Sequence, residues 1–240
     1  MTDNTDTNAA IWKSDEVIKQ WAARANARGR QRIGHWQIMA EILPFEPSDE
    51  FTFLDLGAGM GAAAKVLLEL YPKSNAVLAE FSPQMIAEGT RDLEDYSGRF
   101  RYVEFDMLAG AWPAEIPDHL DAVITSLCIH HMPDDRKQGL FSEIYERLAP
   151  GAWYVNYDPV TSTDPIVEAT WQHANDRGDP EAEEKRRNRT ELEQARFENH
   201  VRYMIPLDQQ LAYFRAAGFE GVDVYWKNLE NVVYAGRRPI

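Results

Sequence analysis

The sequence predicts an α/β protein built around a mostly parallel β-sheet, for three reasons. Short apolar stretches typical of buried strands alternate with helical stretches between residues 51 and 160. A glycine-rich turn, Gly57-Ala58-Gly59-Met60-Gly61, joins the first strand of this region to its first helix. Residues 220–226 and 231–237 then have the pattern of an antiparallel strand pair. Because parallel strands are connected by right-handed helical crossovers, we expect one sheet covered by helices on both faces.

The composition limits the classes of function. With 44% hydrophobic and 27% charged residues, the chain is typical of a soluble globular protein. The single cysteine, Cys128, excludes an internal disulfide and is expected to be a small buried side chain. A formal net charge of −14 disfavours nucleic acid as a partner, because binding phosphates needs basic surface.

The location is predicted from what the sequence lacks. It has neither a secretory signal pattern nor an apolar run near the roughly 20 residues of a membrane span. These features predict a cytoplasmic protein without a membrane partner. A homodimer is left open.

Two basic clusters stand out against the acidic background. The first comprises Lys19 and the arginines at positions 24, 28, 30 and 32, with no carboxylate between Lys19 and Ala40. The second, Lys185 to Arg189, is flanked by glutamates on both sides. Such spacing is typical of a solvated helix face with ion pairs, and we expect the second cluster to be one.

The N-terminal residues 1–45 precede the alternating pattern and are predicted to form a helical lid. One helix should run from Ser14 to about Ala27, and a second from about Arg30 to Leu43, stopping before Pro44. The tryptophans at positions 12, 21 and 36 are expected to pack in this layer rather than contact a ligand.

The glycine turn is the first indication of a ligand. Residues 51–54 form a short buried strand, Asp55 follows it, and a helix should run from Met60 to Tyr71. A turn without Cβ atoms lets a ligand approach the backbone, and the N-terminus of the following helix favours negative charge. This arrangement predicts a nucleotide-type cofactor site. Gly57-x-Gly59-x-x-Ala62 also satisfies the dinucleotide fingerprint, so the glycines alone do not exclude NAD.

Acidic residues at the ends of the next two strands narrow the choice of cofactor. The second strand, Val77 to Ala79, ends at Glu80, where a carboxylate at an open strand end can accept both ribose hydroxyls. A helix then starts at Ser82-Pro83 and runs to about Asp95. The third strand, residues 100–105, ends in Asp106-Met107. Because an aspartate there can accept the adenine amino group, the pattern favours a ligand with a single adenosine.

The rest of the chain completes the sheet. The fourth strand, residues 120–125, runs into Ser126 and the pair His130-His131. A helix should extend from Pro133 to Leu148, closed by Pro150-Gly151, before a fifth strand at residues 153–158. Residues 161–200 are rich in charged side chains and should form two helical pieces over the carboxyl edge of the sheet, as a substrate cover. A last helix is expected from Pro206 to Ala217.

Taken together, these motifs resemble those of the class I S-adenosylmethionine (SAM) methyltransferases. The resemblance rests on Asp55-Leu-Gly-Ala-Gly-Met-Gly, Glu80, Asp106-Met107, Leu148-Ala-Pro-Gly-Ala and Ala217-Gly-Phe, and covers residues 50–160 and 205–240. It implies a Rossmann-like, doubly wound sheet of seven strands, six parallel and one antiparallel. The predicted domain is residues 46–240, preceded by the lid and interrupted by the cover.

The resemblance also implies which residues bind the cofactor. Glu80 would hold the ribose, Asp106 the adenine amino group and Phe81 the adenine ring, while Asp55 would orient the glycine turn. Arg30, in the N-terminal basic cluster, could pair with a carboxylate, either that of SAM or that of the substrate. The full predicted SAM-binding set is Arg30, Asp55, Gly57, Ala58, Gly59, Glu80, Phe81, Met85, Asp106, Met107 and Ser126.

Catalytic residues are expected beyond the fourth and fifth strands. His130 or His131 stands where the family often has a substrate-facing residue, and a histidine there could take a proton from an O–H or N–H group at neutral pH. Asp158 is the third catalytic candidate, and Asn156 and Tyr157 are predicted to contact the substrate. No metal site is predicted, because two histidines adjacent in sequence do not easily share one ion.

The function predicted from these residues is SAM-dependent methyl transfer to oxygen or nitrogen of a small molecule. Three alternatives remain open at this point: SAM chemistry other than methylation, such as cyclisation or elimination; modification of the tRNA wobble uridine, which the acidic charge disfavours; and a non-catalytic SAM-binding protein.

Overall fold

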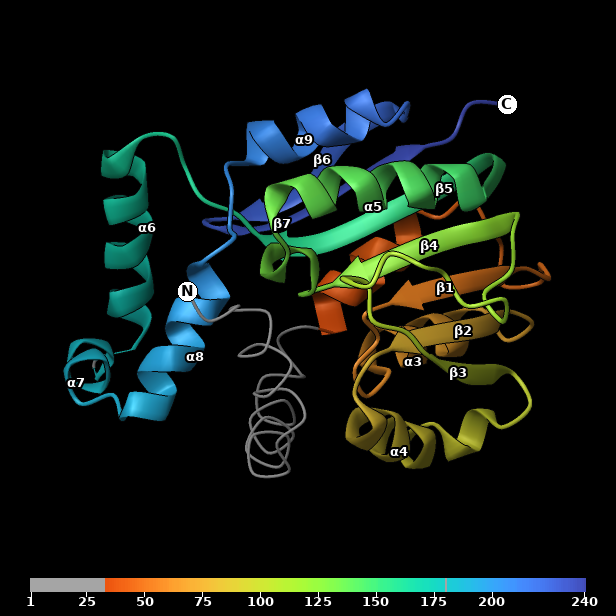
Figure 1. Cartoon of the computed structure of the whole chain (residues 1–240), viewed down its shortest axis with the longest axis horizontal. Coiled ribbons are helices and arrows are strands. Elements are labelled where there is room, and N and C mark those ends of the chain that lie inside the picture. Colours follow the sequence, from red (N-terminus) through yellow and green to blue (C-terminus); the bar gives the residue numbers. More distant parts are fainter. Residues whose placement is uncertain (1–32, 180) are drawn as a thin grey trace.

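The computed structural model describes residues 33–179 and 181–240, which contain a seven-stranded sheet in the order β3-β2-β1-β4-β5-β7-β6 (Figure 1). β7 pairs antiparallel with both β5 and β6, and the other pairs are parallel, so six strands run one way and one runs against them. The predicted fold class is confirmed. The strands are β1 (Thr52–Leu56), β2 (Asn75–Glu80), β3 (Phe100–Glu104), β4 (Leu120–Ser126), β5 (Leu148–Pro159), β6 (Glu220–Asn228) and β7 (Asn231–Arg237).

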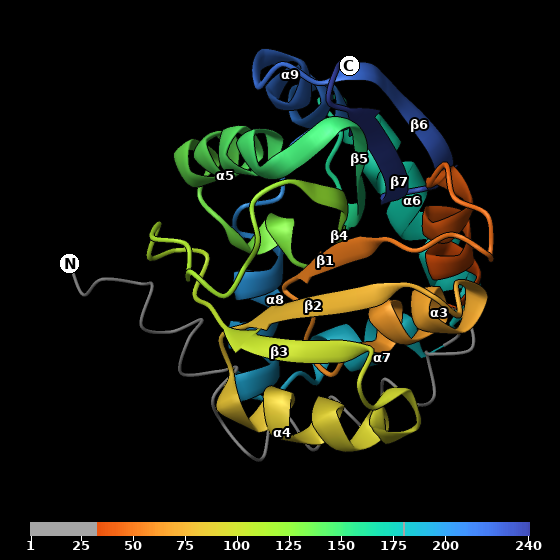
Figure 2. The ribbon, with the colours of Figure 1, turned by 90° about the vertical axis from the view of Figure 1, so that its right-hand side faces the viewer.

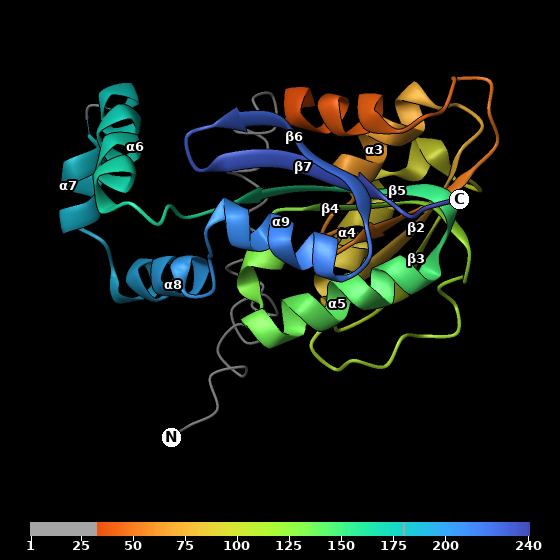
Figure 3. The ribbon, with the colours of Figure 1, turned by 90° about the horizontal axis from the view of Figure 1, so that it is seen from above.

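Helices cover both faces of the sheet (Figures 2 and 3). On one face, α5 (Asp134–Arg147) and α9 (Leu207–Ala216) bury their apolar side chains against the strands. On the other, α3 (Ala62–Leu70) and a helix at residues 33–42 close a second core, and α4 (Pro83–Asp92) packs against β2 and β3. α4 begins where the sequence predicts, because the Ser82 hydroxyl accepts a hydrogen bond from the Met85 backbone N–H.

Two of the differences from the predicted element boundaries move residues of the sequence motifs. β1 continues through Asp55 and Leu56, so the aspartate lies inside the sheet rather than after it. β5 begins at Leu148, directly after α5, so Pro150-Gly151 lies in the strand instead of closing the helix. Gly151 has φ +83°, and its backbone N–H donates to the Arg238 carbonyl oxygen at 2.9 Å. A C-terminal segment distant in sequence therefore holds this irregular start of the strand.

The insertion after the fifth strand lies beyond the carboxyl ends of the strands, as expected for a cover (Figures 1 and 3). A capping box, in which Thr190 and Glu193 satisfy each other's backbone N–H groups, starts a helix beyond the two pieces that the sequence predicts. The Thr161 backbone N–H donates to the Ile205 carbonyl oxygen at 3.0 Å, so the two ends of the insertion meet at its base. The helices of the insertion are α6 (Pro165–Gly178), α7 (Ala182–Arg187) and α8 (Glu191–Val201).

The basic cluster in this insertion forms the ion pairs that the sequence predicts. Arg186 pairs with Asp176 at 2.6 Å, and Arg187 pairs with Glu183 one turn away at 3.0 Å. The other predicted cluster, Lys19 to Arg32, lies outside the described residues. Among the residues that are described, no helix has the length and apolar character needed to cross a lipid bilayer.

The end of the predicted N-terminal lid belongs to the core. In the helix at residues 33–42, Trp36, Met39 and Ala40 are buried against the face that carries α3. Trp36 packs in this core as predicted, but it also lines the cavity of the candidate active site, and its indole N–H donates to the Ser126 hydroxyl at 2.8 Å. Residues 1–32, with the tryptophans at positions 12 and 21, lie outside the described part, so a lid there stays a prediction.

Candidate active site

The glycine turn between β1 and α3 is held tightly against its neighbours. The backbone N–H groups of Gly57 and Ala58 both donate to the Ala79 carbonyl oxygen, at 2.9 and 3.0 Å. Gly57 has φ +76°, a region that residues with a Cβ rarely adopt. A Cβ on Gly57 would lie 2.3 Å from the Sγ atom of Cys128, which is half-buried rather than fully buried as expected. The turn therefore depends on glycine for both its shape and its packing.

Asp55 supports this turn from the sheet. Its side chain is 1% exposed, and Oδ2 accepts a hydrogen bond from the Ala64 backbone N–H in the first turn of α3 at 3.1 Å. Burial raises the pKa of this carboxyl to about 7, although the bond from Ala64 opposes the shift. The geometry fits the predicted orienting role, because Asp55 links the end of β1 to the start of the helix.

Glu80 is buried, not open to solvent as its position at a strand end suggested. It is 5% exposed, with Oε2 accepting from the Gly59 N–H and Oε1 from the Ser82 N–H, both at 2.9 Å. Burial raises the pKa of this carboxyl, and the backbone hydrogen bonds oppose the rise. The carboxylate thus joins the glycine turn to the start of α4.

A cavity of about 1940 Å³ lies between the carboxyl edge of the sheet and the inserted helices. At its wall, Asp106 follows β3 and uses Oδ1 to accept the Leu108 N–H at 2.9 Å. Arg186 and Arg196 of the insertion also line it. Arg30 lies outside the described residues. The remaining predicted cofactor residues all line this cavity: Asp55, Gly57, Ala58, Gly59, Glu80, Phe81, Met85, Asp106, Met107 and Ser126.

His130 and His131 line the same cavity, just after β4. His130 is fixed by the fully buried Asp158, which accepts the His130 backbone N–H on Oδ2 at 2.7 Å and lies 2.6 Å from ring Nδ1 with Oδ1. Burial lowers the pKa of both histidines well below the usual value, so their rings are neutral at pH 7. Asp158, the third catalytic candidate, does not line the cavity and contacts His130 from behind.

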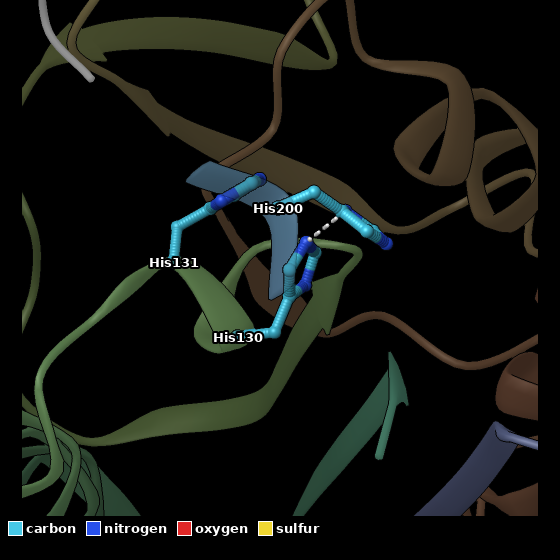
Figure 4. A group of neighbouring side chains, drawn as sticks. All are labelled: His130, His131 and His200. Atoms are coloured by element: carbon cyan, nitrogen blue, oxygen red, sulfur yellow. Dashed lines mark hydrogen bonds between the residues drawn. The ribbon is translucent and has the colours of Figure 1, made fainter. Parts of the chain in front are cut away.

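A third histidine, His200 in α8, completes this group (Figure 4). Its Nδ1 lies 3.1 Å from Nε2 of His130, and its ring centroid lies 6.0 Å from that of His131. Sequence reasoning does not single out His200, because nothing nearby in the chain links it to the other two histidines. The available signal was a histidine inside a segment already predicted to cover the site.

The two predicted substrate residues are not at the cavity, and these predictions are wrong. Asn156 is fully buried in the sheet, where its amide contacts the Thr125 and Tyr234 hydroxyls. Tyr157 is 3% exposed and packs against His35. The reason is that β5 continues beyond both residues, with β4 on one side and β7 on the other, so they lie in the sheet interior.

Comparison with known proteins agrees with this geometry. Residues 53–151 match the family described as a methyltransferase domain. A curated relative, demethylmenaquinone methyltransferase of Thermus thermophilus, is 33% identical over 116 residues, which cover 48% of this chain and 50% of that protein. This chain thus spans about half the length of that relative.

Solved structures show the same fold. An O-methyltransferase family protein from Burkholderia thailandensis superposes with a TM-score of 0.69 at 15% identity, over 95% of this chain and 61% of that one. Human N-acetylserotonin methyltransferase, solved in complex with SAM, superposes with a TM-score of 0.63 at 16% identity, over 100% of this chain and 61% of that one. Residues 53–151 therefore match a methyltransferase domain, and the chain has the Rossmann-like fold of these solved methyltransferases, as the resemblance in the sequence implied.

Proposed function

We propose that the protein transfers the methyl group of SAM to an oxygen or nitrogen atom of a small molecule. The observation that carries the proposal is the hydrogen bond between the glycine turn and Glu80. Both line one cavity together with Asp106. The turn lets a ligand approach its backbone, the Glu80 carboxylate can accept the ribose hydroxyls, and Asp106 can accept the adenine amino group. These groups match adenosine, which both SAM and S-adenosylhomocysteine contain.

The acceptor would lie between the bound SAM and the histidines. Methyl transfer is an in-line displacement in which the sulfur–methyl bond breaks as the new bond forms, so the site mainly positions the two reactants. His130 and His131 would handle the acceptor's proton, and Asp158 would hold the His130 ring in place. The inserted helices line the cavity as well, which supports an enclosed small molecule as the acceptor.

Binding measurements test the cofactor. Calorimetry should give heats of binding for SAM and S-adenosylhomocysteine and none for NAD. Binding of NAD without SAM would refute the proposal.

Incubation with SAM alone, followed by mass spectrometry of the products, tests the reaction. Release of S-adenosylhomocysteine only after metabolites are added supports methyl transfer, whereas methylthioadenosine formed without an acceptor indicates cyclisation or elimination instead.

Glu80→Ala is expected to weaken SAM binding by about 10–150-fold, the loss of roughly 1.5–3 kcal/mol for hydrogen bonds to a charged group. Because Glu80 also accepts the Gly59 and Ser82 N–H groups, the free energy of unfolding should fall as well, by about 1–3 kcal/mol. Glu80→Gln keeps one acceptor oxygen for one of the two backbone N–H groups and places its NH2 group at the other, so it tests the carboxylate with only part of the structural loss. It should lose SAM affinity with a smaller change in stability, as measured by calorimetry and urea unfolding.

Glu104→Ala is the matched control, because Glu104 is exposed and lies opposite Glu80 on the neighbouring strand. It should leave SAM affinity unchanged. If Glu80→Ala retained the affinity of the wild type, the ribose would have to be bound elsewhere.

Two further sequence-based expectations, a cytoplasmic location and a homodimer, stay predictions.

A further inference from the structure

The three histidines at the cavity wall have the arrangement of a metal site. Each of His130, His131 and His200 offers one ring nitrogen, and these nitrogens all lie within 4.8 Å of one another (Figure 4). In a tetrahedral zinc site with Zn–N distances of about 2.0–2.1 Å, two ligand nitrogens are about 3.3 Å apart. The 3.1 Å between Nε2 of His130 and Nδ1 of His200 is already close to that spacing. The nitrogen of His131 lies within 4.8 Å of the other two, so a bound ion would require the side chains to rotate towards it.

The groups behind the rings support the same assignment. Metal-binding histidines usually donate the second ring N–H to a carboxylate or a backbone carbonyl, which fixes the ring and directs the other nitrogen to the ion. His130 has such a partner in Asp158, 2.6 Å from Nδ1. With Asp158 ionised, Nδ1–H donates to it and the lone pair on Nε2 points towards His200. His131 has a hydrogen bond with the backbone of Asn199.

The charges nearby are compatible with a cation. Besides burial, the positive charge of Lys137 helps to lower the pKa of His130. Its ammonium group, however, pairs with Asp134 at 3.2 Å and also donates to the Tyr203 carbonyl oxygen. Asp158 is fully buried behind His130, and burial raises the pKa of its carboxyl to about 7; in its ionised form it would supply a compensating negative charge. Neutral imidazole is also the form in which histidine binds metals.

We propose that His130, His131 and His200 bind a divalent first-row transition metal ion, with zinc as the best match to three imidazole ligands. Three histidines leave one position of a tetrahedral ion open, the arrangement of catalytic rather than structural zinc. Because all three histidines line the cavity that contains the glycine turn, the open position would be accessible to an acceptor.

The chemical role of the ion rests on the proposed methyl transfer. An acceptor hydroxyl bound at the open position would lose its proton to solvent more readily, because the ion stabilises the alkoxide. The oxygen would then attack the methyl carbon as the bond to the SAM sulfur breaks, leaving the methyl ether and S-adenosylhomocysteine. In this scheme the three histidines are metal ligands, and this role replaces the proton transfer proposed above for His130 and His131. Asp158 remains a positioning residue for His130.

Metal uptake tests the site directly. Protein stripped with a chelator is titrated with Zn²⁺, bound metal is measured by mass spectrometry, and Co²⁺ is used as a probe with visible absorption. We expect a single ion per chain and the absorption of tetrahedral Co²⁺ with nitrogen ligands. Asp158→Asn should weaken Zn²⁺ binding by about 10–100-fold, and His200→Ala, which removes a ligand on the cover, should weaken it further.

His173→Ala is the matched control, an exposed histidine in α6 of the same insertion. It should bind Zn²⁺ as the wild type does. Equal Zn²⁺ binding by the wild type and His200→Ala, or no Zn²⁺ binding by the wild type, would overturn the metal site. The two proposals are separated by measuring SAM binding to the same metal-free protein by calorimetry. If this protein binds SAM but not Zn²⁺, the metal site is refuted and the methyltransferase proposal stands.

Discussion

Gly57→Ala is expected to lower the free energy of unfolding by about 2–5 kcal/mol, roughly 1–2 for a left-handed non-glycine residue and 1–3 for the overpacked contact. The φ angle of Gly57 is +76°, and its new Cβ would lie 2.3 Å from Cys128 Sγ and 2.9 Å from Cys128 Cβ. Relief of this contact would displace the turn that lines the cavity. SAM binding should therefore be lost together with stability, as measured by urea unfolding and calorimetry.

Gly98→Ala is a control that separates strain from contact. Gly98 has a similar φ of +86°, but within residues 33–179 and 181–240 no heavy atom lies within 4 Å of its added Cβ. Gly98→Ala should lower the free energy of unfolding only by the cost of the left-handed backbone conformation, about 1–2 kcal/mol, and should leave SAM affinity unchanged. Cys128→Ala in the Gly57→Ala background removes the sulfur and should restore part of the stability. If Gly57→Ala and Gly98→Ala lowered the free energy of unfolding by the same amount, the packing of Cys128 against the turn would not contribute to stability.

Deletion of residues 164–199, with a short Gly-Ser bridge, is expected to abolish turnover while SAM still binds. The deletion removes α6, α7 and most of α8, whose residues line part of the cavity. It also removes the helical turns that support His200. The hydrogen bond between Thr161 and Ile205 brings the two ends of the insertion together, so a short bridge can close the chain.

Turnover of the deletion variant is measured with an acceptor that has first been identified, in the wild type, by release of S-adenosylhomocysteine. Calorimetry with SAM and thermal unfolding then report whether the remaining domain is folded. Since Asp55, Glu80 and Asp106 lie at the sheet, SAM affinity should change little. Turnover of the same acceptor at the original rate would mean that the cover does not determine the substrate.

Features that depend on neighbours along the chain could be predicted from the amino-acid sequence. A glycine turn between a strand and a helix requires only local backbone conformations, so Gly57, Gly59 and Gly61 identify it without a structure. Glu80 and Asp106 follow from the rule that parallel strands end at a common edge. The class of fold follows from the alternation of strands and helices.

Features that depend on contacts between distant segments required the three-dimensional structure. Asn156 and Tyr157 look like residues at a strand tip, but β5 pairs with β7 along this stretch and buries both. His200 meets His130 only because the insertion folds back over the carboxyl edge of the sheet. The physical reason is that backbone conformation is set locally, whereas burial and side-chain contacts depend on which segments pack together.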